Sequence, residues 1–167
     1  MIRACLIVLA LLATTIMAQG TYAHGEAHQD HDDHVVEADG VRATHAWANA
    51  TTGSTALVYV ELENISESAV TLTGAETELA ASAQLVGLEN TGGELVYTVI
   101  PQMPIAAGSK MVLSPNGLAI RLEGLTAPLV HGEHFHIEIA LGDVHLDTAV
   151  EIESATATQH SHAGHQH

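Results

Sequence analysis

The sequence contains one cysteine, Cys5, which lies in a segment that we expect to be removed. Without that segment the chain has no thiol, which excludes disulfides and thiolate metal sites. Methionine is scarce as well, because the rest of the chain keeps only Met103 and Met111. Soft sulfur ligands, which select Cu(I), are therefore nearly absent.

Basic residues are also rare. Lysine and arginine together number 4, against 20 aspartates and glutamates, for a formal net charge of −16. A nucleic-acid partner is excluded, because binding of phosphates requires clustered Lys and Arg. Aromatic residues make up only 3% of the chain, so the core is expected to be aliphatic. An apolar content of 47% argues against disorder of the whole chain.

The first 23 residues have the pattern of a secretory signal peptide. Arg3 supplies a positive charge, residues 4–13 are almost wholly apolar, and Thr21-Tyr22-Ala23 offers small residues before a cut. The apolar run is short for a membrane-spanning helix. We therefore predict cleavage after Ala23, with Ala18 as a second candidate, and a periplasmic protein with no membrane association after cleavage.

Histidine is the abundant residue, with 13 copies. The segments 24–40 and 154–167 are polar, lack apolar periodicity and are predicted to be flexible. Histidines at this density bind Cu, Zn and Ni with little discrimination, and the carboxylates between them attract cations. Solubilising disorder is the alternative interpretation of both segments. Their histidines are His24, His28, His31, His34, His160, His162, His165 and His167.

Cleavage after Ala23 would make His24 the new N-terminus. Its α-amine and imidazole can bind one metal ion together, and a second imidazole completes the three-nitrogen set called a histidine brace. Such a set suits Cu(II), which favours tetragonal nitrogen ligation. The second imidazole is left open among His28, His31, His34, His45 and the histidines of a predicted hairpin.

Residues 41–153 show strand signals. Short apolar, β-branched runs are bounded by Gly, Pro, Asn or Ser, which is typical of an all-β sandwich or small barrel. The predicted strands cover residues 55–63, 70–73, 95–100, 110–113, 118–122, 135–141 and 144–150.

The last two predicted strands form a hairpin around Gly142-Asp143. Apolar residues alternate with polar ones, so one face is apolar and the other is polar. With this turn, Ala140 pairs with His145 and Glu138 pairs with Asp147. The polar face is either an ordinary solvated surface or a second metal site. Its histidines are His134, His136 and His145.

Three segments share their order and spacing with a known family. Residues 45–64 (HAWANATTGSTALVYVELEN) contain an Ala-Trp pair, a short loop and an apolar strand that ends in Asn. Residues 105–125 and 128–139 follow with Ala-Gly, Pro-Asn-Gly-Leu and Pro-Leu elements. Over about 43–152 the chain thus resembles the periplasmic copper chaperone PCu(A)C family. The resemblance implies a cupredoxin-like or immunoglobulin-like β-sandwich that handles copper and passes it toward a copper oxidase.

The copper motif of that family, His-x10-Met-x21-His-x-Met, is missing. Alignment on residues 115–118 puts its four ligands at Val86, Tyr97, Ala119 and Arg121. None of these is a soft ligand, and the positive charge of Arg121 opposes cation binding. We therefore expect no Cu(I) site of the usual kind.

Together these features predict a periplasmic copper-binding protein or copper chaperone. It would hold Cu(II) rather than Cu(I) through histidines, with His24 as anchor, and zinc also fits such ligands. It would store copper or deliver it to a periplasmic copper enzyme or copper-transfer partner.

Three other functions remain open. The first is a general Zn, Cu and Ni buffer that acts through the histidine-rich segments, with the sandwich as passive carrier. The second is an enzyme, since a histidine brace can oxidise polysaccharides. We do not expect one, because the few aromatic residues leave little surface for stacking on sugars. The third is a domain for non-metal interactions.

Overall fold

The computed structural model describes residues 35–161, so the predicted signal peptide and residues 24–34 and 162–167 of the two histidine-rich segments lie outside the described residues. All regular structure in this range is β-strand, which confirms the predicted all-β fold. No helix in the described part of the chain has the length and apolar character needed to cross a membrane. The strands are β1 (Val35–Ala38), β2 (Val41–Asn49), β3 (Thr55–Asn64), β4 (Val70–Glu76), β5 (Ser82–Thr91), β6 (Glu94–Val99), β7 (Met103–Ile105), β8 (Lys110–Leu113), β9 (Leu118–Glu123), β10 (His134–Leu141) and β11 (Val144–Glu153).

Seven of these strands were predicted, with ends that differ by three residues or fewer. The strands β1, β2, β5 and β7 were not predicted. Of these, β1 lies in segment 24–40, which is expected to be flexible only until metal or a tertiary contact orders it. Its residues pair with β2 from Val35 opposite Thr44 to Ala38 opposite Val41, so a tertiary contact orders this part of the segment.

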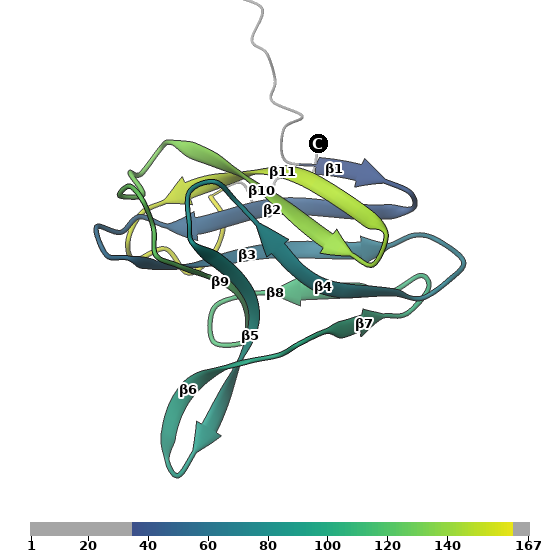
Figure 1. The fold of residues 1–167 in the computed structure, drawn as a ribbon, viewed down its shortest axis with the longest axis horizontal. Helices are drawn as coiled ribbons and strands as arrows, with labels where there is room; N and C mark the ends of the chain where they lie inside the picture. The colour runs from purple at the N-terminus through teal and green to yellow at the C-terminus, as the bar shows by residue number, and fades with distance from the viewer. Residues whose placement is uncertain (1–34, 162–167) are drawn as a thin grey trace, which may run out of the picture. The chain divides into compact units, whose positions relative to one another are not determined.

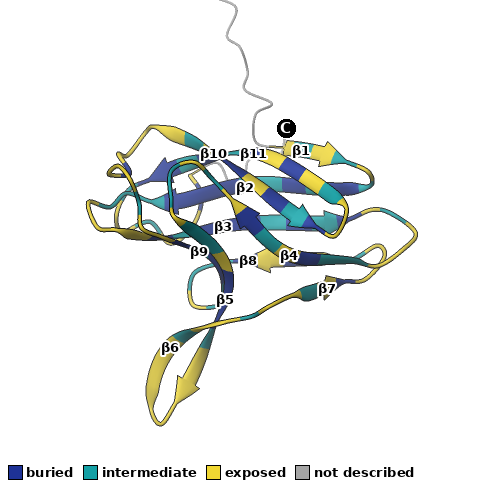
Figure 2. Cartoon of the chain, in the orientation of Figure 1, coloured by how far each residue is buried: buried dark blue, intermediate teal, exposed yellow. Residues whose placement is uncertain are grey.

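The strands form one open, mixed sheet with the order β6-β5-β9-β3-β2-β11-β10-β4-β7, with β1 added to β2 and β8 to β3 (Figure 1). All pairs are antiparallel except β11 with β2, which run parallel. Nine strands, all except β1 and β6, contribute buried side chains to one core, so the sheet curls around it as a sandwich. None of the buried members of this core is aromatic, as the composition predicted. Figure 2 shows these buried positions alternating with exposed ones along β10 and β11.

The β10–β11 hairpin has the predicted register. Ala140 lies opposite His145 and Glu138 opposite Asp147. The turn contains Gly142 with φ +68°, a left-handed conformation that glycine adopts without a Cβ clash. Ile137, Ile139 and Leu146 are buried in the core, so the alternate residues point away from it. We call the surface of β10, β11 and β2 that points away from the core the outer face.

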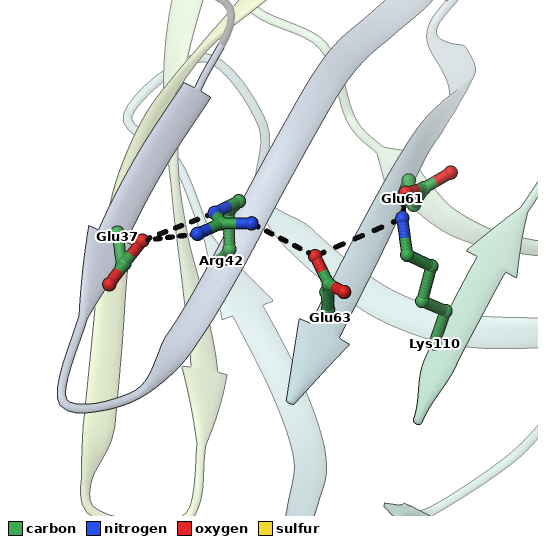
Figure 3. Close-up of polar contacts among 5 residues, drawn as sticks. All are labelled: Glu37, Arg42, Glu61, Glu63 and Lys110. Carbon is green, nitrogen blue, oxygen red and sulfur yellow. Dashed lines mark hydrogen bonds and ion pairs between the residues drawn. The ribbon is translucent and has the colours of Figure 1, made fainter. Parts of the chain in front are cut away.

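The basic residues of the described part of the chain are all paired with carboxylates. Arg42 contacts Glu37 at 2.9 Å and Glu63 at 3.1 Å, and Lys110 contacts Glu61 and Glu63 (Figure 3). Arg121 pairs with Glu123 at 3.1 Å. Exposed pairs of this kind each stabilise the fold by only about 0–1 kcal/mol. Their consequence is electrostatic, because each Lys and Arg of residues 35–161 already has a carboxylate partner.

Asn64 at the end of β3 is fully buried and joins two turns. Its amide nitrogen donates to Ser68 O at 2.8 Å and Ile105 O at 3.0 Å, and its oxygen accepts from Ser66 N at 3.1 Å. Asn64→Ala is expected to lower the free energy of unfolding by about 2 kcal/mol or more, because buried groups lose their partners. Urea denaturation measures this. The control Asn90→Ala removes one exposed bond to Gly93 N and should cost under about 1 kcal/mol. Equal losses would contradict the buried role of Asn64.

Candidate metal centre

Residues 154–161, which follow β11, fold back over the outer face. Asn49 of β2 holds them, since its amide nitrogen donates to Ser154 O at 2.9 Å and Ala157 O at 3.0 Å. Ser161 N donates to Glu153 Oε1 at 2.7 Å. The first half of the predicted C-terminal tail is therefore packed against the domain. We call residues 154–161 the strap.

The strap carries His160 onto the outer face, between two carboxylates of β11. His160 Nε2 lies 2.9 Å from Glu151 Oε2 and 3.9 Å from Glu153 Oε1. One nitrogen and one oxygen from each carboxylate lie within 4.8 Å of one another. His160 is 2% exposed and Glu153 is 8% exposed. We call Glu151, Glu153 and His160 the buried triad. Nitrogen and oxygen atoms of these kinds are able to bind a divalent metal ion.

The carboxylate of Glu153 is held in its ionised form. Burial by itself raises its pKa, but hydrogen bonding by Ser161 and the positive charges of His160 and His131 more than offset this effect. The pKa of Glu153 is consequently lowered from its ordinary value. A carboxylate that is ionised at neutral pH is ready to bind a cation.

A β-bulge brings a second imidazole to the triad. The register between β2 and β3 shifts between Thr44 and Trp47, so β2 has one extra residue there. His45 lies in this bulge with φ +51°, a left-handed conformation that is uncommon for residues other than glycine. Its ring centroid lies 5.2 Å from that of His160. The bulge thus interrupts the alternation of β2 at His45 and places its imidazole beside that of His160.

The structure brings together only some of the predicted metal ligands. The rings of His45 and His160 lie next to each other. The hairpin histidines each contact a carboxylate, His136 Nδ1 with Asp147 Oδ1 at 3.0 Å and His145 Nδ1 with Glu138 Oε1 at 2.8 Å. His134 lies near His136, with ring centroids 6.2 Å apart. The remaining predicted ligands lie outside the described residues: His24, His28, His31, His34, His162, His165 and His167.

Sequence reasoning missed Glu151 and Glu153. The available signal was weak: the alternation of β11 continues past Val150, where the strand was predicted to end, so both glutamates share the face of Asp147. A longer strand prediction would have placed them on the outer face. Nothing in their spacing pointed to His160.

The outer face is hollowed into a cleft of about 620 Å³ beside the triad. Its lining includes three imidazoles, of His131, His134 and His136. It also includes four carboxylates, of Glu133, Asp147, Glu151 and Glu153, and no Lys or Arg. A surface lined by one sign of charge attracts counter-ions, so the cleft favours cations.

The positions that correspond to the chaperone family's copper ligands lie elsewhere, and two of the four are closed by apolar packing. Val86 and Ala119 are neighbours on β5 and β9 and are fully buried. They pack with Trp47 and Tyr59, whose rings are 4.7 Å apart, and with Tyr97. The geometry agrees with the sequence in giving this region no sulfur or imidazole ligand.

This closed packing predicts an unusual titration of Tyr59. Burial raises the pKa of its hydroxyl from 10.0 to about 12, with a further contribution from neighbouring Tyr97. The unfolded chain therefore loses this proton first, so the folded state should lose stability as pH rises from 10 toward 12. Phenolate absorbance against pH should show a late transition that Tyr59→Phe lacks. A Tyr59→Phe protein with the same late transition would contradict the assignment.

Solved structures similar to this one include PCuAC domains. The apo PCuAC domain of PmoF2 has a TM-score of 0.63 at 16% identity, covering 75% of this chain and 99% of that one. The copper-bound PmoF2 domain has a TM-score of 0.61 at 14% identity, covering 72% and 98%. Cu(I)-bound DR1885 from Deinococcus radiodurans has a TM-score of 0.54 at 28% identity, covering 66% and 76%. These likenesses confirm the predicted cupredoxin-like fold.

A curated relative comes from Leifsonia xyli subsp. xyli (strain CTCB07), where it is described as "Putative lipoprotein Lxx21020". It is 30% identical over 108 residues, which are 64% of this chain and 65% of the relative, just under two thirds of its length. The family described as "Putative lipoprotein LpqE-like" matches residues 41–160, a range that includes His45 and the whole triad. The chain therefore belongs to the LpqE-like family and has the fold of PCuAC domains.

Proposed function

We propose that the protein binds copper in the cell envelope, holds it as Cu(II), and stores it or delivers it to a copper enzyme or copper-transfer partner. The buried triad is the observation that carries this proposal. His160 is enclosed between two carboxylates, with His45 beside it, next to a cleft whose lining contains no Lys or Arg.

The donor atoms favour Cu(II) over Cu(I). Imidazole nitrogen and carboxylate oxygen suit Cu(II), whereas Cu(I) is selected by sulfur. Met111 is buried in the core and Met103 packs against it, so neither methionine of the described residues belongs to the triad. Zinc fits the same donor set and is the main competitor.

The comparisons support copper as the cargo. PmoF2 and DR1885 are described as bound to copper, the latter to Cu(I). This chain shares their fold but has Val86, Tyr97, Ala119 and Arg121 where the usual motif of the family would stand. We infer that copper binding is retained on a different surface with harder ligands, as a binding and transfer function and not as catalysis.

An envelope location follows from the same comparisons, because the family and the Leifsonia relative are both described as lipoproteins. We propose that residues 1–23 act as a signal peptide that is cleaved after Ala23, and that the protein acts in the periplasm. Residues 24–34 and 162–167, which flank the described domain, would then capture metal through their histidines.

Removing the triad imidazole tests the function directly. With less than one equivalent of Cu(II), EPR of the protein should show a mixed nitrogen and oxygen signal that His160→Ala loses, with affinity at that site at least about tenfold weaker. The control His145→Ala removes an exposed imidazole that also contacts a carboxylate. That variant should bind as the unsubstituted protein does. If both variants retain the signal, the triad is not the copper site.

The proposed brace at His24 has its own test. Protein that begins at His24 should show an additional EPR signal with nitrogen ligands only, and one Ala placed before His24 should abolish that signal, since it displaces the α-amine. His160→Ala should leave this signal intact. If neither change affects Cu(II) binding, the protein is a metal buffer that acts through its histidine-rich segments.

A further inference from the structure

The cleft contains an imidazole pair that the triad does not use. β10 carries His134 and His136 on the outer face, where both are exposed and line the cleft. Their ring centroids lie 6.2 Å apart. Two imidazoles on one tetrahedral ion place their centroids about 5 Å apart, because each metal–nitrogen bond is about 2.0–2.1 Å. The exposed pair can therefore bind one ion after the two rings close by about 1 Å.

His136 is oriented for such a role. Asp147 Oδ1 lies 3.0 Å from His136 Nδ1, so the carboxylate holds the ring and leaves Nε2 as the ligand nitrogen. Histidines that bind metals are commonly held by a carboxylate in this way. Asp147 belongs to the same cleft, and its charge adds to the field that attracts cations.

The pair also adjoins the triad. His134 lies directly opposite Glu151 in the β10–β11 pairing, and Glu151 contacts His160 at 2.9 Å. Side chains directly opposite in an antiparallel pair lie about 4.5–5.5 Å apart at Cβ. Glu151 thus stands between an exposed imidazole pair and the buried imidazole of His160.

We propose that His134 and His136 form a loading site that captures a divalent metal ion from solvent and passes it through Glu151 to the buried triad. The proposal rests on the proposed function of the triad. The ion is one that prefers imidazole and carboxylate, Cu(II) or Zn(II), and at each step it exchanges one ligand while it retains another.

Residues of a loading site affect the rate of metal binding, whereas residues that bind the metal in the triad affect the equilibrium affinity. Trp47 is the single tryptophan and lies beside Glu151 in the β2–β11 pairing, so Cu(II) in the triad should quench its fluorescence. The experiment is stopped-flow mixing of the full chain with Cu(II). In the double variant His134→Ala/His136→Ala, the rate at which Cu(II) reaches the triad should fall by up to about tenfold, because capture by the cleft is lost. Release to a chelator should slow by the same factor. The equilibrium affinity should then change less than about twofold.

The control is His145→Ala, whose imidazole lies on the same hairpin outside the cleft lining. It should load at the rate of the unsubstituted protein. Unchanged rates in the double variant would overturn the loading site. Slower loading together with a large loss of affinity would also overturn it, since the pair would then be ligands of the triad's ion.

His160→Ala separates this proposal from the one on which it rests. If His160→Ala loses the slow, tight quenching of Trp47 fluorescence and the double variant still loads at the normal rate, only the loading site is contradicted. Retention of tight quenching in His160→Ala would contradict the proposed function, and the transfer step would fail with it. Far-UV circular dichroism of each variant confirms that the domain is folded.

Discussion

The parallel pairing of β11 with β2 is the constraint on which the candidate centre depends. It sets Glu151 beside Trp47 and Glu153 beside Asn49. Asn49 then binds the strap, and the strap delivers His160 to the two glutamates. A slip of one residue would turn both glutamates toward the aliphatic core, because side chains alternate between faces along a strand. The register therefore positions both glutamates on the outer face and also keeps their charges out of the core.

Charge distribution makes this arrangement suited to a cation. Two carboxylates close to a buried imidazole are costly to desolvate unless a positive charge lies between them. In the structure His160 contacts both, and the basic residues of the described part pair with other carboxylates on other strands (Figure 3). A metal ion that binds between His160 and Glu151 replaces the proton that they share. Metal binding should therefore also strengthen the attachment of the strap.

The proposed centre lies on a different surface of the fold from the motif positions of the chaperone family. Where the chaperone family's motif would place soft ligands, Val86 and Ala119 pack against Trp47 and Tyr59. Nitrogen and oxygen donors gather instead where β2, β11 and the strap meet. Trp47 packs with Val86 and Ala119 and also neighbours Glu151. It therefore lies between the family's motif positions and the buried triad. A change in ligand hardness, from sulfur to imidazole and carboxylate, accounts for the expected change from Cu(I) to Cu(II).

Local sequence was sufficient for features that depend on neighbouring residues. The alternation around Gly142-Asp143 predicted the hairpin, its register and its histidine-rich face, because a two-residue turn sets the pairing of its strands. Composition predicted an aliphatic core. Alternation did not reveal β5, whose SAQLVGLENT pattern depends on pairing with β6 and β9. The triad was also beyond local patterns, because β11 and the strap meet only through the pairing with β2 and the hydrogen bonds of Asn49. The sequence by itself determined which ligand chemistry the chain can offer, since that depends on residue types. Tertiary structure decided which histidines share a site, since contacts between distant strands arise only when the sheet closes around its core.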